Sequence, residues 1–143
     1  MKSSIRFIFE DVSFFLPKRT ILKQWLLDCI ATEKKALEEL NVVFCSDKFL
    51  LDVNRKFLEH DYYTDIITFQ YNNKKEPISG EIFISYDRVK ENADEFNVPR
   101  LVELNRVMAH GVAHLLGYSD KTKKQKEAMK TKEDYFLTLL PLK

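Results

Sequence analysis

The sequence has few of the residues that build secreted, membrane or low-complexity proteins. Three glycines and four prolines are scattered through 143 residues, and no repeat, linker or low-complexity stretch occurs. The two cysteines, Cys29 and Cys45, form neither a disulfide framework nor a metal-binding cysteine motif. No apolar run approaches the roughly 18 to 20 residues that a membrane-spanning helix needs. We therefore expect no transmembrane helix, and two thiols that fill a core in a reducing compartment.

The sequence also has no large excess of positive or negative charge. Lysine and arginine number 23 against 22 aspartates and glutamates, so that the net charge is +1. This balance excludes a global attraction to nucleic acid or to an anionic membrane, and a partner of that kind must contact a local patch. Residues 121–143 carry seven lysines and three acids, which is such an asymmetry. Glu10 and Asp11 interrupt the apolar stretch that a secretory signal needs, so we expect a cytoplasmic protein.

The hydrophobic fraction, 45% of the residues, is sufficient for one compact domain with a real core. Alternating and β-branched segments predict strands at about residues 4–9, 41–45, 64–71 and 80–85, with turn residues at 72–77 making the last two a hairpin. Helical spacing predicts helices at about residues 17–40, 46–57, 86–96, 99–116 and 122–140. These elements predict an α+β fold, with a four-stranded mixed sheet and about five helices.

Two of the three histidines occur in one short segment near the end of the fourth predicted helix. A spacing of four residues places His110 and His114 on one helix face, where two imidazole nitrogens can bind one metal ion at roughly 2.0 to 2.1 Å. Gly117 can adopt the left-handed backbone that ends a helix. The chain can then double back and bring Asp120 to the same point as a third ligand, which leaves one coordination position open.

Each of these residues has an alternative interpretation. The histidines could be a core pair satisfied by backbone groups, and Asp120 could be the N-cap of the last helix. Thr122 and Gln125 provide that helix with a capping box, which leaves Asp120 free to bind a metal. The spacing also resembles that of metzincin proteases, which carry a glutamate general base directly after the first histidine. That position is Gly111 here, and a glycine cannot accept a proton.

The segment from His110 to Tyr118 resembles the signature of the YbeY family, H-G-x-x-H-L-x-G-Y. Two further blocks resemble the family, residues 54–69 and residues 80–85, so the similarity covers nearly the whole chain. Asp120 stands where most members have a third histidine. That substitution keeps a zinc-competent ligand set, lowers the positive charge of the site by one and makes a bound water somewhat less acidic.

YbeY proteins are bacterial rRNA maturation factors, regarded as single-strand-specific, metal-dependent endoribonucleases. The resemblance implies one hydrolase domain over residues 1–143, with one zinc or another divalent ion on the long helix of the C-terminal half. It also implies maturation of the 3′ end of small-subunit rRNA and a role in ribosome assembly. The expected partners are single-stranded RNA or rRNA and the ribosomal small subunit or assembly factors, with neither a membrane nor DNA.

One departure concerns an arginine that many members carry and that is thought important for RNA cleavage. Leu58 occupies that position here, and Arg55 lies three residues away. In the same loop, His60 occupies the place of a lysine and could provide a cation or a proton donor. An ordinary loop histidine is the alternative interpretation of His60.

Hydrolysis of a phosphodiester also needs groups that transfer protons and groups that bind RNA. The candidates for proton transfer are Glu103, Asp65, His60 and Glu81. Their alternatives are structural: Glu103 could pair with Arg106 or Lys90, and Asp65 could cap a turn or hydrogen-bond a ligand histidine. The candidates for RNA binding are Lys121, Lys123, Lys124 and Tyr118, and Tyr62 and Tyr63 could also offer rings.

The sequence thus leaves three hypotheses open. The first is a metal-dependent endoribonuclease. The second is a metzincin-like metallopeptidase whose general base is displaced from its usual position. The third is a ribosome-assembly factor with a structural metal and little catalysis, and Leu58 at the arginine position favours it slightly. An open metal site favours catalysis, whereas a closed site with four protein ligands favours a structural role.

Overall fold

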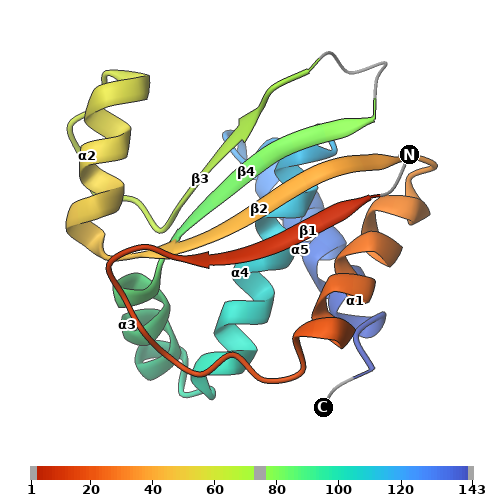
Figure 1. Ribbon diagram of the computed structural model, residues 1–143, viewed down its shortest axis with the longest axis horizontal. Coiled ribbons are helices and arrows are strands. Elements are labelled where there is room, and N and C mark those ends of the chain that lie inside the picture. The colour runs from red at the N-terminus through yellow and green to blue at the C-terminus, as the bar shows by residue number, and fades with distance from the viewer. Residues whose placement is uncertain (1–2, 73–76, 142–143) are drawn as a thin grey trace.

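The computed structural model describes residues 3–72 and 77–141, and five helices and four strands lie within these ranges (Figure 1). In chain order they are β1 (Ser4–Phe9), α1 (Arg19–Thr32), β2 (Leu37–Cys45), α2 (Asp47–Leu58), β3 (Ile66–Gln70), β4 (Ile78–Ser85), α3 (Tyr86–Phe96), α4 (Arg100–Leu115) and α5 (Lys123–Thr138). The predicted α+β domain with a four-stranded mixed sheet is confirmed.

The sheet has the strand order β1-β2-β4-β3. Strands β1, β2 and β4 are parallel to one another, and β3 lies antiparallel to β4 at one edge. This antiparallel pair agrees with the predicted hairpin, although residues 73–76 of its turn lie outside the described part of the chain. The edge position of β3 leaves one of its sides without a neighbouring strand, and β3 also contacts α4.

The helices are distributed unequally over the two faces of the sheet (Figure 1). One face packs against α1, α3, α4 and α5, which together enclose the main hydrophobic core. Trp25 fixes α1 to α5 there, because its buried indole Nε1 donates a hydrogen bond to the carbonyl oxygen of Phe136 at 2.7 Å. Among the described elements, α2 alone covers the opposite face, over a smaller cluster that includes Leu50, Val53 and Ile67.

The helix predicted over residues 17–40 is wrong at its C-terminal end. Helix α1 ends at Thr32, and Leu37 already belongs to β2. The chain reverses at Lys34, which has a left-handed φ of 57° although glycine is the usual residue for that conformation. Leu37 and Leu40 therefore pack in the sheet layer of the core. The apolar spacing of this segment also suits a helix, but the pairing of β2 with β1 and β4 makes it a strand.

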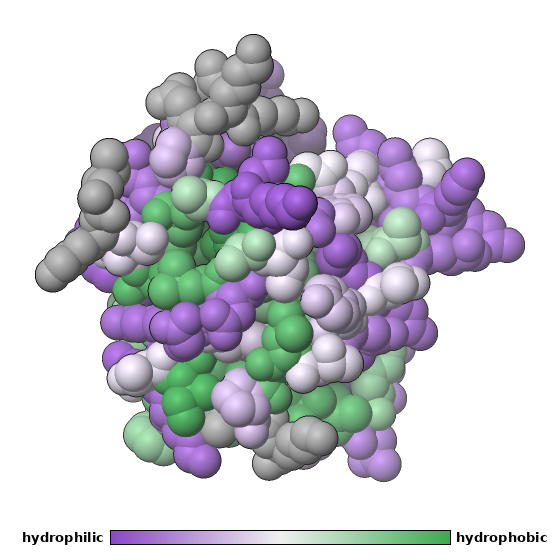
Figure 2. Space-filling view, turned by 90° about the vertical axis from the view of Figure 1, so that its right-hand side faces the viewer, coloured by the Kyte–Doolittle hydropathy of each residue, from purple (hydrophilic) through white to green (hydrophobic). Residues whose placement is uncertain are grey.

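The two cysteines lie where the sequence predicts them. Cys29 and Cys45 are buried, unpaired thiols in the two hydrophobic clusters, and burial raises the pKa of each to about 12. Within the described ranges, no helix combines the length and the apolar composition that a bilayer crossing requires. Figure 2 shows the side of the molecule that carries α1, where hydrophobic side chains lie between hydrophilic ones at the surface.

Helix α4 approaches the sheet most closely at Gly111. A β-carbon at this position would lie 2.8 Å from Cγ2 of Ile82 and 3.0 Å from Cδ1 of Ile66. Both neighbours belong to strands, and Ile82 is completely buried, so that neither can move away at little cost. Glycine is therefore required here by the distance between helix and sheet, although the backbone conformation is helical.

Gly111→Ala should destabilise the fold by about 1 to 3 kcal/mol, because the added methyl group overpacks the contact with Ile82. At an unconstrained helix position the same substitution would stabilise the protein by roughly 0.5 to 1 kcal/mol. A double-mutant cycle measures the interaction energy between the two positions. It compares the free energies of unfolding in urea of the wild type, Gly111→Ala, Ile82→Ala and the double variant. The destabilisation caused by Gly111→Ala should vanish when Ile82 is also replaced by alanine. A gain in stability from Gly111→Ala alone would contradict this packing.

Candidate metal centre

Helix α4 carries both histidines on one face, on the flank beside Gly111. The rings of His110 and His114 lie 4.5 Å apart between centroids, and their side chains are 21% and 24% exposed. One turn of helix separates the two residues, and buried neighbours such as Val107 and Val112 hold α4 in the core. The helix therefore holds the histidines in a half-buried position that solvent can still reach.

The chain reverses directly after α4, as the glycine predicts. Gly117 has a φ of 105°, its N–H donates to the carbonyl oxygen of His114, and the N–H of Tyr118 donates to that of Ala113. These two bonds form a Schellman motif, which ends the helix and turns the chain back along it. The Thr122 capping box with Gln125 then begins α5, so that Asp120 is not the N-cap.

The reversal brings the carboxylate of Asp120 to the two imidazoles. Its Oδ2 lies 3.2 Å from Nε2 of His110 and 3.5 Å from Nε2 of His114, and the two Nε2 atoms are 2.9 Å apart. Ligand atoms around a tetrahedral ion lie about 3.3 to 3.6 Å apart when the bonds are roughly 2.0 to 2.2 Å long. The three residues form a group that could hold a metal ion.

Hydrogen bonds at the other ring nitrogens fix how the imidazoles are oriented. Nδ1 of His110 lies 2.5 Å from a carboxylate oxygen of Glu133, and Nδ1 of His114 lies 3.0 Å from the carbonyl oxygen of Tyr118. Both partners are acceptors, so each Nδ1 carries a proton. This arrangement directs the Nε2 lone pairs toward Asp120, as carboxylate and carbonyl partners do for metal-binding histidines in general.

The arrangement needs a positive charge at its centre. Two Nε2 lone pairs and a carboxylate oxygen repel one another at these distances unless a proton or a cation lies between them. The pKa values reflect this competition. Burial lowers the pKa of His110, but the hydrogen bond and charge of Glu133 outweigh burial and raise it overall, whereas burial and the charge of His110 lower the pKa of His114.

A cavity of about 90 Å³ adjoins His110 and contains further carboxylates. Asp65 at the start of β3 and Glu103 on α4 line it together with Arg106 and Glu133. Glu103 is 6% exposed, and burial raises its pKa against the lowering effect of the Arg106 charge. The structure thus brings two of the four candidates for proton transfer, Asp65 and Glu103, to the candidate metal centre.

The other two candidates lie elsewhere. Glu81 is on the face of β4 opposite Ile82, where it accepts hydrogen bonds from Tyr71 at 2.5 Å and Asn41 at 3.5 Å. His60 is in the loop after α2 and stacks on Tyr62. Among the described residues, no hydrogen bond, ion pair or ring contact joins either one to the histidines of α4.

The candidates for RNA binding are divided in a similar way. Lys121, Lys123 and Lys124 are exposed and follow Asp120 directly, so they border the candidate metal centre. The phenol of Tyr118 instead donates a hydrogen bond to Glu33 at 2.7 Å, and the ammonium group of Lys132 lies 5.2 Å from its ring. Tyr118 therefore connects the loop after α4 to the end of α1.

Glu133 is the residue that the sequence analysis missed. It is 8% exposed on α5 and bridges His110 to Arg106, whose guanidinium Nη1 donates to its second oxygen at 3.2 Å. A signal for it exists in the sequence, because Glu133 lies between Met129 and Phe136 at helical spacing and so places a carboxylate on the apolar face of α5. A buried acid of this kind requires a partner.

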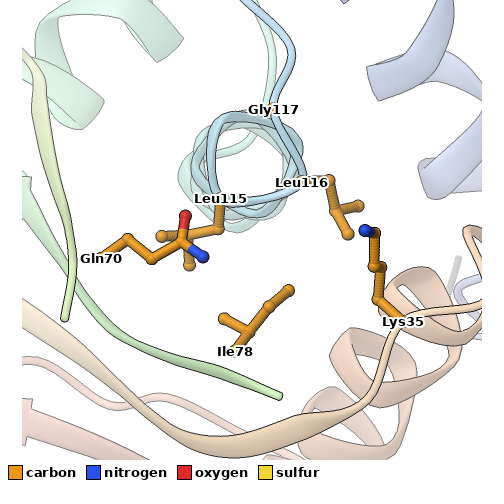
Figure 3. A pocket seen from close by; sticks show the side chains of 6 residues that line it. All are labelled: Lys35, Gln70, Ile78, Leu115, Leu116 and Gly117. Carbon is orange, nitrogen blue, oxygen red and sulfur yellow. The ribbon is translucent and has the colours of Figure 1, made fainter. Parts of the chain in front are cut away.

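A second hollow lies at the C-terminal end of α4 (Figure 3). Aliphatic side chains form much of its wall, and Lys35 and Gln70 contribute its polar groups. Its volume of about 50 Å³ admits little more than water. None of its lining residues belongs to the group of His110, His114 and Asp120.

Comparison with known proteins places this chain in a family. The model of the family "Endoribonuclease YbeY" matches residues 15–140. The endoribonuclease YbeY of Cytophaga hutchinsonii is 51% identical over 97% of this chain and 98% of its own, and that of Amoebophilus asiaticus is 43% identical over 95% and 92%. A Thermotoga maritima protein solved in solution has a TM-score of 0.66 and 28% identity, with 95% of this chain and 88% of its own covered.

Glu133→Gln should weaken zinc binding by about tenfold or more, because a neutral amide stabilises the orientation and basicity of His110 less well than a carboxylate. Competition with a zinc-binding dye measures this affinity. Glu127→Gln is the matched control, since Glu127 is an exposed acid on the same helix. Equal affinities for the Glu133→Gln variant and the control would contradict the role of Glu133.

Glu103→Gln should raise stability at neutral and higher pH. Because burial raises the pKa of Glu103, its contribution to stability is present below the unfolded pKa and is lost as the pH rises through the folded pKa. The advantage of the glutamine variant should therefore shrink as the pH falls toward the ordinary pKa of a glutamate. Denaturant unfolding at several pH values tests this, with Glu95→Gln on the surface of α3 as control. A pH-independent difference would contradict it.

Proposed function

Because the chain belongs to the endoribonuclease YbeY family, we propose that it is a metal-dependent hydrolase that cleaves single-stranded RNA. The proposal rests above all on the convergence of Nε2 of His110, Nε2 of His114 and Oδ2 of Asp120 within hydrogen-bonding distances of one another. This set contains three protein ligands, which is the number that catalytic zinc sites use when they keep one position open. Residues 1–143 then form one hydrolase domain.

His110, His114 and Asp120 would hold the metal ion, and zinc is the ion that two imidazoles and a carboxylate suit. When bound, such an ion supplies Lewis acidity that activates water and neutralises charge on phosphoryl oxygens. The residues around it prepare the site. Glu133 fixes the ring of His110, and the carboxylate of Asp65 adds negative charge that favours a cation before an RNA phosphate approaches.

Asp65 and Glu103 are the groups that we propose for proton transfer. Both line the cavity beside His110, and either can hold a proton near the cleaved bond. Glu103 suits the role of acid, because its raised pKa keeps a larger share of the carboxyl protonated than an exposed glutamate has. Asp65 suits the role of base, since it directly precedes β3 and lines the same cavity as Glu103.

Lys121, Lys123 and Lys124 provide the positive surface for the RNA backbone. They lie around the start of α5, where the helix dipole disfavours cations and where the first turn contains no acid. Cations at a helix N-terminus are unfavourable for stability, and unfavourable residues of this kind often serve a function. Three lysines beside a metal centre are suited to bind phosphate groups. The net charge of only +1 predicts weak binding to free RNA.

The finer details of the function follow from the family resemblance. We propose that the ion is zinc and that the substrate is the 3′ end of small-subunit rRNA. The small ribosomal subunit or an assembly factor would then strengthen the weak binding of RNA by this chain alone. A role in ribosome assembly implies a cytoplasmic protein. The reducing cytoplasm also keeps free thiols such as Cys29 and Cys45 unoxidised.

Gly111 argues against the metallopeptidase alternative. The position that holds the glutamate base in metzincins has no room for a side chain here, since a β-carbon would contact Ile82 at 2.8 Å. Asp65 or Glu103 would have to replace that base. A casein hydrolysis assay tests the alternative, and proteolysis that depends on the metal would favour it over the nuclease.

His114→Ala should abolish both the metal and the activity. Elemental analysis of protein purified without added metal should find one equivalent of zinc in the wild type and almost none in the variant. Cleavage of a single-stranded rRNA fragment should be lost in parallel by a factor of at least about 100, because one ligand fewer removes the site. Asp120→His restores a third imidazole, so this variant should retain the metal.

His60→Ala is the control for metal content, since His60 lies in the loop after α2 and contacts Tyr62. Metal without RNA cleavage in the wild type would favour the assembly factor with a structural ion. Wild-type protein that contains no metal and binds none on addition of zinc would refute the proposed ligand set.

A further inference from the structure

The loop between α2 and β3, residues 59–65, exposes two adjacent tyrosine rings. Tyr62 and Tyr63 are each 55% exposed, although aromatic rings of this size are usually packed. Phe57 and Leu58 at the end of α2 are exposed beside them in sequence, at 61% and 39%. Clustered apolar surface of this kind marks a contact site more often than scattered single residues do.

The loop is held rigidly by Asn54, which is 1% exposed. The side-chain amide of Asn54 donates to the carbonyl oxygen of Tyr62 at 2.9 Å, and its backbone carbonyl accepts from the N–H of His60 at 3.1 Å. The ring of His60 stacks on that of Tyr62 with 5.2 Å between centroids. The rings are therefore already ordered in the folded protein, so that binding a ligand costs little further conformational entropy.

Tyr63 has a cation fixed on its ring. The guanidinium carbon of Arg88 lies 5.5 Å from the ring centroid, and Asp47 accepts a hydrogen bond from Arg88 Nε at 3.1 Å. Arg88 is therefore held in place by α2 and cannot swing freely. A tyrosine with one partner fixed in this way and half of its surface exposed is suited to stack with a second flat group.

The loop of the two tyrosines leads directly to a residue of the cavity beside the candidate metal centre. Asp65, only two residues beyond Tyr63, lines the cavity next to His110. Two residues of extended chain span about 7 Å. The N–H of Ser85 donates to the carbonyl oxygen of Asp65 at 2.9 Å, which fixes the start of β3 relative to the sheet.

The cations of this region are largely neutralised. Arg55 pairs with Asp52 and Asp61, and Arg88 pairs with Asp47 and Glu91. A phosphate backbone finds little net positive charge here, whereas an unpaired base finds ring faces, and stacking of bases on aromatic side chains tolerates any sequence. The charges and the rings thus favour bases over phosphates as the groups that this loop binds.

We propose that Tyr62 and Tyr63 form a stacking site for unpaired nucleobases of the RNA strand beside the cleaved bond. The site rests on the proposed function and deepens it, because stacking on splayed bases makes the enzyme select single strands over duplexes, whose bases are already stacked. The lysines at the start of α5 then bind the backbone, and the two tyrosines bind the bases.

The test compares wild type, Tyr62→Ala, Tyr63→Ala and the double variant in binding a fluorescein-labelled single-stranded oligoribonucleotide of mixed sequence. Chelator is present, so that no cleavage occurs. Each substitution should weaken binding by about tenfold, by the same factor at low and high salt, because stacking releases no counterions. Tyr63→Phe retains the ring and should bind as the wild type does.

Tyr71→Ala is the matched control, since Tyr71 is 61% exposed and follows the C-terminal end of β3, whereas the loop of the two tyrosines precedes its N-terminal end. A second probe carries abasic residues in the same strand, and on this probe the wild type and the tyrosine variants should bind equally. Unchanged binding in the double variant, an equal loss in Tyr71→Ala, or an equal loss on the abasic strand would overturn the stacking site. An equal loss on the abasic strand would assign the rings to contacts with the sugar-phosphate backbone.

Cleavage assays of the metal-loaded proteins separate this inference from the proposed function. The tyrosine variants should show a raised KM with an unchanged zinc content. A wild type that binds the strand through these rings and does not cut it would refute the nuclease while the stacking site stands. A wild type that cuts with a KM equal to that of the double variant would refute the stacking site alone.

Discussion

The close contact of α4 with the sheet at Gly111 is the constraint on which the candidate metal centre depends. Because no β-carbon fits between the helix and Ile82, α4 lies directly against the sheet, and the flank of α4 beside this contact carries His110 and His114, whose side chains are 21% and 24% exposed. The same contact excludes a side chain directly after His110. Packing thus determines both where the histidines point and which residue cannot act as a base.

The charges and hydrogen bonds around the two histidines make the site favour a cation. Acceptors at both Nδ1 atoms leave the Nε2 lone pairs facing each other and the carboxylate of Asp120, an arrangement that is stable only with positive charge between them. Asp65 and Glu133 add negative charge around it. The site therefore suits a cation, and under the proposed function the exposed lysines after Asp120 bind the anionic substrate.

Local patterns in the sequence predict most of this fold and the centre of the site. The i, i+4 spacing and Gly117 are local signals, so the paired histidines and the chain reversal could be anticipated. The turn at Lys34 could not, because nothing in the side chain of a lysine indicates a left-handed backbone. Glu133 and Glu81 depend on tertiary structure: one reaches His110 from another helix, and the other lies on the wrong face of β4.

The most direct test of this account is a crystal structure of the zinc-loaded protein, with anomalous scattering recorded at the zinc edge. The account predicts one zinc ion bound by Nε2 of His110, Nε2 of His114 and the carboxylate of Asp120, with no fourth ligand from the protein. An ion bound elsewhere, or a fourth protein side chain that closes the coordination, would contradict a catalytic centre at this place.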